Sequence, residues 1–187
     1  MIGRELRFES GTKLGKVSGL LHVPSNAKVL YLLAHGAGAG MRHPFMEEIS
    51  ALLASRSVAT LRYQFPYMEA GRRRPDYPNV LKATVRGATA EAGRLVPDLP
   101  IIAGGRSMGG RMTSTAVAEK PLDGVRALVF LGFPLHPPQR PGVERAEHLS
   151  LVNLPMLFLQ GTRDALCHLT LMGPVVDKLG TRARLHK

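Results

Sequence analysis

A serine placed between glycines is the feature of this sequence best suited to covalent chemistry. The short apolar run 101–104 leads to Ser107, which Gly105 and Gly109 flank at Gly-x-Ser-x-Gly spacing, and a helix-compatible segment covers residues 111–120. A sharp strand-to-helix turn at this point would lift the serine hydroxyl clear of the sheet and place it at the positive end of a helix dipole. We therefore interpret Ser107 as a candidate nucleophile. The alternative is a glycine-rich turn that only connects a strand to a helix.

A second glycine-rich segment, residues 35–40, follows the apolar run 28–34. Its sequence, His-Gly-Ala-Gly-Ala-Gly, does not fit the dinucleotide-binding pattern Gly-x-Gly-x-x-Gly. A loop in this position can supply main-chain N–H groups to a developing oxyanion, so we expect the donors to be Ala37 and Met108, the residue after the serine. The alternative is a phosphate-binding nest without catalysis. His35 lies on this loop and is interpreted as an orienting or structural histidine.

An acidic residue follows another short apolar run, residues 156–159. Behind a glycine-containing turn over residues 160–163, Asp164 comes after Ser107 in the chain, as the order serine, acid, histidine requires. We interpret Asp164 as the carboxylate that orients a histidine base. The alternative is an N-cap aspartate for a helix over residues 165–179.

Strand and helix patterns alternate along the chain, and these elements must position the candidate side chains. Several apolar runs lack polar alternation, which is typical of strands buried on both faces of a parallel sheet. We therefore expect an α/β fold with a mainly parallel sheet, helices on both faces and an antiparallel N-terminal hairpin. The expected strands are residues 5–9, 16–23, 28–34, 57–63, 101–104, 126–131, 156–159 and 182–186, and the expected helices are residues 44–56, 80–96, 111–120 and 165–179.

One long loop in this pattern has aromatic side chains with two open roles. It covers residues 64–78, and the aromatic residues Tyr63, Phe65 and Tyr67 either wall a pocket or anchor the loop in the core. Asn79 is expected to cap the helix that follows.

The composition predicts a single globular domain over residues 1–187. Hydrophobic residues are 44% and charged residues 21%, which is ordinary for such a domain. No apolar run is long enough to span a bilayer, and the N-terminal residues do not read as a secretory signal. Cys167 is the only cysteine, which fits a reducing cytoplasm. The net charge of +11 comes mostly from scattered arginines without a nucleic-acid-binding motif, so we expect no specific nucleic-acid partner.

Taken together, four segments resemble the α/β-hydrolase superfamily. Within it, the chain looks most like the small, capless, dienelactone-hydrolase-like group, which includes testis-expressed protein thirty and its bacterial relatives. The resemblance covers nearly the whole chain and rests on residues 35–40, 104–109, 133–137 and 160–164.

This resemblance implies an α/β-hydrolase fold with serine-hydrolase chemistry. It implies Ser107 as the nucleophile, Asp164 as the triad acid, and an oxyanion hole from Ala37 and Met108. It implies no metal and no organic cofactor.

One part of the family pattern is absent. The family's base is a histidine on an Asp/Asn-His-Ser/Gly segment after a further helix and a further strand. Here the further strand begins at residues 182–186 and the chain stops at Lys187, so we expect a truncated C-terminal strand and helix. The candidates for a substitute base or for the pocket lining are His136, His168 and His186. His136 follows the expected strand 126–131, where ligands bind in open α/β sheets, unless it is an ordinary surface-loop histidine.

Two functions therefore remain open from the sequence. The first is hydrolysis of small carboxylic esters or thioesters through an acyl-enzyme at Ser107. The second is a catalytically weak or inactive hydrolase-fold protein used for binding or as a scaffold, because a serine without an adjacent base is a poor nucleophile. We expect a small-molecule ester as the partner and no membrane, and an exposed sheet edge would favour a homo-oligomer.

Overall fold

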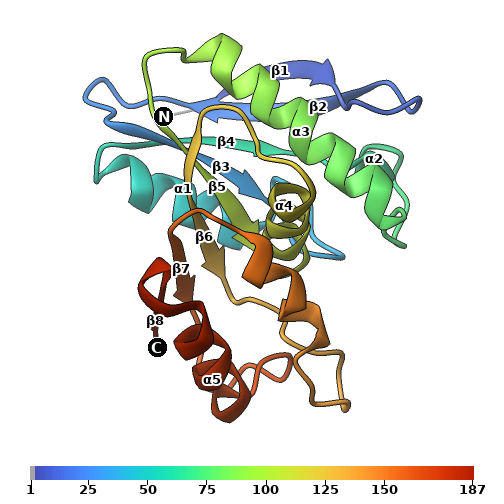
Figure 1. Cartoon of the computed structure of the whole chain (residues 1–187). Helices are drawn as coiled ribbons and strands as arrows, with labels where there is room; N and C mark the ends of the chain where they lie inside the picture. The colour runs from blue at the N-terminus through green and yellow to red at the C-terminus, as the bar shows by residue number, and fades with distance from the viewer. Residues whose placement is uncertain (1–2) are drawn as a thin grey trace.

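The computed structural model describes residues 3–187. Met1 and Ile2, which begin the N-terminal segment considered for a secretory signal, lie outside the described residues. Within residues 3–187, eight strands form one sheet in the order β1-β2-β4-β3-β5-β6-β7-β8 (Figure 1). The strands are β1 (Arg4–Glu9), β2 (Lys16–His22), β3 (Val29–Ala34), β4 (Val58–Tyr63), β5 (Ile101–Arg106), β6 (Val125–Leu131), β7 (Met156–Leu159) and β8 (Ala183–His186).

The sheet confirms the expected mixture of strand directions. The β1–β2 and β2–β4 pairs are antiparallel, so the N-terminal hairpin continues the sheet beyond β4. The pairs from β4 through β8 are parallel. Since parallel strands end at the same edge, the loops after β3, β5, β6 and β7 meet at the carboxyl edge of the sheet.

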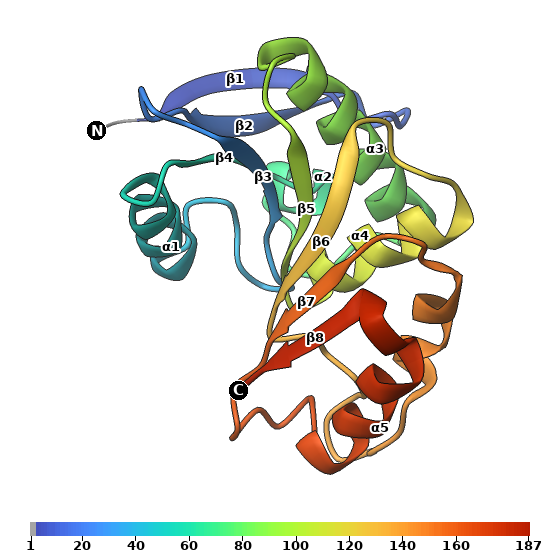
Figure 2. The same cartoon turned by 60° about the vertical axis from the view of Figure 1, so that its left-hand side comes forward.

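Helices cover both faces of the sheet, as the alternating pattern predicts. Helix α1 lies on one face, and α3, α4 and α5 lie on the other (Figure 2). The helices are α1 (Pro44–Ala54), α2 (Pro66–Glu69), α3 (Pro78–Leu95), α4 (Met108–Glu119) and α5 (Leu169–Leu179), with short 3-10 helices η1 (Glu144–Leu151) and η2 (Gly180–Arg182).

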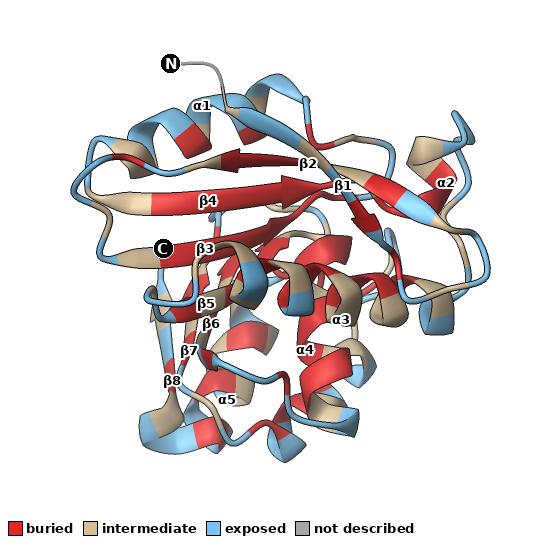
Figure 3. Ribbon diagram, turned by 90° about the horizontal axis from the view of Figure 1, so that it is seen from above, coloured by how far each residue is buried: buried red, intermediate tan, exposed pale blue. Residues whose placement is uncertain are grey.

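The core lies along the central strands of the sheet. Figure 3, a view from above, shows that most residues of these strands are buried. In β3, the five residues 30–34 are buried: Tyr31 and Leu33 pack against Met46 of α1, and α3 and α4 also contact the strand. This continuous burial explains why the apolar run lacks polar alternation.

The long loop over residues 64–78 differs from the expectation because it contains the short helix α2. Tyr63, Phe65 and Tyr67 are fully buried, so they anchor this segment in the core and do not wall an open pocket. The expected cap at Asn79 is wrong. Helix α3 already begins at Pro78, whose fixed φ suits the first helical position and whose missing N–H is not needed there.

Candidate active site

Ser107 lies at the sharp turn between β5 and α4, and its backbone is strained. Its φ of 48° and ψ of −116° lie in a region that side chains other than glycine rarely adopt. Its N–H donates to Leu131 O on the neighbouring strand at 3.2 Å. Helix α4 starts at the next residue, so the partly exposed Ser107 side chain stands at the positive end of that helix dipole.

Glycines let this turn pack directly against β3. A Cβ on Gly105, which has a φ of +141°, would collide with the Ala34 carbonyl oxygen. A Cβ on Gly109 would lie 2.5 Å from His35 O. The close approach therefore fixes the position of Ser107 relative to the loop that follows β3.

His35 fixes the start of that loop from inside the core. Its Nδ1 lies 2.8 Å from Gly36 O, and its Nε2 accepts from the N–H of Phe65 at 3.1 Å. Burial lowers the pKa of His35 to about 4, so the ring is neutral near neutral pH. These contacts confirm the interpretation of His35 as a structural histidine.

A cavity of about 290 Å³ opens beside Ser107. It brings together three of the predicted site residues, Ala37, Ser107 and Met108, from the two glycine-rich segments. Ala37 is exposed, and Met108 is the first residue of α4. The lining residues are Ala37, Pro75, Asp76, Pro78, Leu81, Ser107, Met108, Arg111, Met112, Pro134, Arg145 and Leu166.

Two arginines on this cavity were not predicted from the sequence. Within residues 3–187, the buried Nε of Arg111 has no hydrogen-bond partner, and neither Arg111 nor Arg145 forms an ion pair with a carboxylate. Burial lowers the pKa of Arg111, and the positive charge of Arg145 lowers it further. The third charged residue of the cavity, Asp76, is already paired with Arg72 at 2.6 Å. The cavity therefore presents an excess of positive charge beside Ser107.

Arg145 lies on η1, which contacts α4, and its Nη1 donates to His136 O at 3.1 Å. His148 of η1 lies with Nε2 2.8 Å from the hydroxyl oxygen of the buried Ser114 of α4. Burial, together with the charge of Arg111, lowers the pKa of His148 to about 4. The pair holds η1 against α4, and Ser114 itself is inaccessible.

Asp164 lies at the same edge of the sheet but is not part of the cavity lining. Its Oδ2 accepts from Gln160 Nε2 at 2.8 Å, and its Oδ1 accepts from Leu166 N–H at 2.9 Å. Oδ2 is also 3.4 Å from the position that a Cβ on Gly132 would take, next to the end of β6. The alternative role as a helix cap is wrong because α5 begins only at Leu169, with His168 at the cap position.

The three candidate histidines occupy different environments, and none of them lines the cavity beside Ser107. His136 is buried, its Nδ1 lies 2.9 Å from Pro137 O, and its Nε2 accepts from His168 N–H at 3.3 Å. The rings of His168 and His136 meet edge to face at 4.7 Å, and the His168 side chain is exposed. His186 is exposed at the end of β8, where its carbonyl accepts from Gln160 N–H. Within residues 3–187, no hydrogen bond joins a histidine to the Ser107 hydroxyl.

His35 and His148, whose pKa values are lowered by desolvation, predict a loss of stability on acidification. Their pKa values of about 4 lie below the ordinary value of 6.5, so the folded chain binds fewer protons than the unfolded chain between these values. The stabilisation is complete above about pH 6.5 and is lost as the pH falls toward 4, with a contribution from the fully buried His35 of the order of 3 kcal/mol. Urea unfolding of the wild-type protein and of His148→Asn across this range tests the prediction. The variant should show the shallower pH dependence, and equal slopes would contradict it.

The match to a family model decides the identity of the fold. A model described as "Alpha/beta hydrolase domain" matches residues 27–186. This chain belongs to the alpha/beta hydrolase family. The match includes both glycine-rich segments, the strands β3 to β8 and Asp164.

Solved alpha/beta hydrolases share this architecture. A dienelactone hydrolase from Anabaena variabilis is 24% identical with a TM-score of 0.77, covering 99% of this chain and 85% of that chain. An alpha-beta serine hydrolase homologue from Coxiella burnetii is 14% identical with a TM-score of 0.77, covering 99% and 86%. A serine hydrolase without a lid from Xanthomonas campestris is 15% identical with a TM-score of 0.76, covering 100% and 83%. At these identities the likeness to the solved structures establishes the fold alone.

In the part of the chain that the structure describes, no group of three or more His, Cys, Asp or Glu residues is placed to hold a metal ion. Across the same residues, every helix is too short or too polar to cross a membrane.

Proposed function

We propose that this alpha/beta hydrolase cleaves small carboxylic esters or thioesters through an acyl-enzyme at Ser107. The observation that carries the proposal is the strained Ser107 backbone at the start of α4, on a cavity shared with Ala37 and Met108. A strained backbone persists where the surrounding fold imposes it, and such sites are often functional.

In the proposed mechanism, the Ser107 hydroxyl oxygen attacks the carbonyl carbon of the substrate. The main-chain N–H groups of Ala37 and Met108 stabilise the negative charge on the carbonyl oxygen. The bond to the alcohol or thiol then breaks, and that group leaves with the proton released by the serine. Water hydrolyses the acyl-serine to a carboxylic acid and restores the hydroxyl.

The proton transfer from Ser107 requires a histidine base. We propose that Asp164 orients this base. The ring of His136 is occupied by contacts with Pro137 and His168, so it does not serve Ser107 in this arrangement. His168 and His186 have exposed side chains and remain the candidates within residues 3–187.

The second candidate function is a catalytically weak binding or scaffold protein with this fold. It is favoured by the lack of a hydrogen bond between Ser107 and any histidine in the described part of the chain. Loss of one triad member leaves only ~10³–10⁴-fold acceleration over water, from the oxyanion hole and binding.

Trapping the acyl-enzyme separates these two functions. The protein is mixed with p-nitrophenyl acetate, quenched in acid and weighed intact by mass spectrometry. The hydrolase proposal predicts a mass increase of one acetyl group, located on the peptide that contains Ser107. Folded protein that releases p-nitrophenol no faster than buffer, and that carries no acetyl group on this peptide, would favour the binding function.

Arg111 and Arg145, which form no ion pair with a carboxylate within residues 3–187, predict that negatively charged esters are preferred. Hydrogen bonds to charged groups are worth about 1.5–3 kcal/mol, so Arg111→Met should lower kcat/KM for an ester with a free carboxylate by ~10–100-fold. A neutral ester of equal length should change by less than about threefold, because it has no charge to pair with the guanidinium. Steady-state kinetics with both esters, and with Arg145→Met as a second variant, provide the measurement. Equal losses for the two esters would show that the arginine does not select substrate charge.

A further inference from the structure

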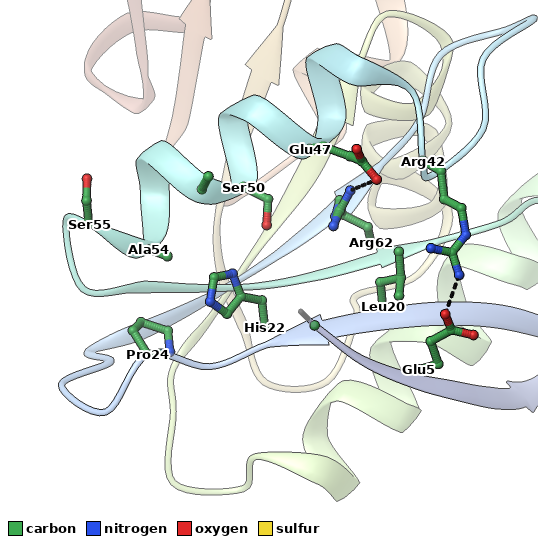
Figure 4. A pocket seen from close by; sticks show the side chains of 12 residues that line it. Glu5, Leu20, His22, Pro24, Arg42, Glu47, Ser50, Ala54, Ser55 and Arg62 are labelled. Carbon is green, nitrogen blue, oxygen red and sulfur yellow. Dashed lines mark hydrogen bonds and ion pairs between the residues drawn. The ribbon is translucent and has the colours of Figure 1, made fainter. Parts of the chain in front are cut away.

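A second cavity, of about 510 Å³, lies between α1 and the start of the N-terminal hairpin (Figure 4). It shares no lining residue with the cavity at Ser107. We refer to it as the α1 groove. Its lining residues are Gly3, Glu5, Leu20, His22, Pro24, Arg42, Glu47, Ser50, Ala51, Ala54, Ser55 and Arg62.

The register of two strands places polar side chains on the floor of the α1 groove. In the antiparallel β2–β4 pair, Leu20 lies opposite Arg62, and His22 lies opposite Thr60. Side chains at alternate positions of a strand share a face, and so do directly opposed residues. The hydroxyl of Thr60 contacts Ser50 of α1 at 2.5 Å, so this is the face that α1 covers.

Arg62 is the central polar group of the groove. It is only 8% exposed, and one terminal nitrogen, Nη1, donates to Met41 O at 2.9 Å. The carboxylate of Glu47 is 3.9 Å away, and its side chain is 54% exposed. Within residues 3–187, the buried Nε of Arg62 has no hydrogen-bond partner. A buried donor without an acceptor costs free energy, most of all when the group is charged. An acceptor that bound in the groove and took the hydrogen bond from Arg62 Nε would remove this cost.

The other groups that line the groove indicate which kind of acceptor would fit next to Arg62. The carboxylates of Glu5 and Glu47 lie at its rim, with Glu5 paired to Arg42 at 2.6 Å, and they would repel a dianion more strongly than a monoanion. Leu20 and Ala54 supply apolar surface. Toward the end near Ala54 lies His22, whose Nε2 is buried and without a partner in the described chain (Figure 4).

We propose that the α1 groove binds a small monocarboxylate with a short apolar body. The carboxylate accepts from Nε of Arg62, and the hydrocarbon extends along the groove toward Ala54 (Figure 4). A phosphate dianion has no hydrocarbon part that could cover the apolar surface of the groove. Because it carries two negative charges, the carboxylates of Glu5 and Glu47 would also repel it more strongly. This binding does not depend on the proposed hydrolysis, because the groove and the Ser107 cavity are separate.

The test follows the side-chain Nε–H resonances of the arginines by NMR during titration with hexanoate. Arg62→Lys assigns the Arg62 resonance, and Arg111 reports on the Ser107 cavity in the same spectrum. The proposal predicts a saturable shift of the Arg62 resonance with hexanoate, no shift with 1-hexanol, and weaker binding of inorganic phosphate. An unshifted Arg62 resonance, an equal shift with 1-hexanol, or tighter binding of phosphate would overturn it.

Two variants that leave Arg62 in place test the site further. Glu47→Gln removes a competing carboxylate and should tighten hexanoate binding by about threefold, as expected for an exposed charge. Ala54→Leu fills the groove and should weaken binding by ~10-fold or more, while the Arg111 resonance is unaffected. The matched control is Ala90→Leu at an exposed position of α3. Unchanged binding in both Glu47→Gln and Ala54→Leu, with folding confirmed by circular dichroism, would contradict the proposal.

Discussion

Replacement of Ser107 by alanine is expected to lower kcat for a small activated ester by at least ~10³-fold, because no other group would form the acyl intermediate. The oxyanion donors are main-chain groups, so the variant should keep the residual acceleration that they provide. Initial rates with p-nitrophenyl acetate, corrected for buffer hydrolysis, give the comparison.

Ser150→Ala is the matched control for this experiment. Ser150 is an exposed serine on η1 whose hydroxyl donates only to Glu147 O, so its loss should leave kcat within about twofold. Urea melts of both variants exclude unfolding as the cause of a loss. If Ser107→Ala were folded and as active as the wild type, the measured hydrolysis would come from another group.

Gly105→Ala is expected to cost about 4 kcal/mol of unfolding free energy, which combines backbone strain with overpacking. The φ of +141° is unfavourable for alanine, and the new Cβ would collide with the Ala34 carbonyl oxygen on the adjacent strand. Equilibrium unfolding in urea gives the difference from the wild type. A variant that cannot be purified folded agrees with the prediction, since this cost approaches the total stability of a small domain.

Gly161→Ala provides the control for the glycine prediction. No atom lies within 4 Å of the position that its Cβ would take, and its φ is not in the positive region. Its stability should therefore change by less than about 1 kcal/mol. Equal effects at the two glycines would show that the close packing of β5 on β3 does not determine the turn.

The sheet and its central turn could be predicted from the sequence because their signals are local. Strand β7 was predicted with the observed bounds, since an apolar run of four residues ends at a polar, glycine-containing segment. The start of α3 was missed because Asn79 and Pro78 both favour a helix start, and the fixed φ of proline prevailed.

Only the site residues that come soon after the end of a strand could be predicted from the sequence. Parallel pairing of β3 with β5 brings Ala37 and Ser107 together, and this pairing follows from the fold class. The approach of Arg145 to Arg111 was not predictable, because η1 packs on α4 and Arg145 donates to His136 O, and both contacts join different segments of the chain. One contact between η1 and α4 is the hydrogen bond between His148 and Ser114. That contact joins a buried serine to a histidine far along the chain and leaves no periodic pattern in the sequence.

Labelling with a fluorophosphonate tests the central claim most directly, since the probe reacts with a serine hydroxyl only where it is activated as a nucleophile. The folded protein is treated with the probe, digested and mapped by mass spectrometry, with Ser107→Ala in parallel. We expect a stoichiometric adduct on Ser107 and none on the variant. A folded protein that remains unlabelled, or that carries the adduct on a different residue, would contradict the assignment of Ser107 as the nucleophile.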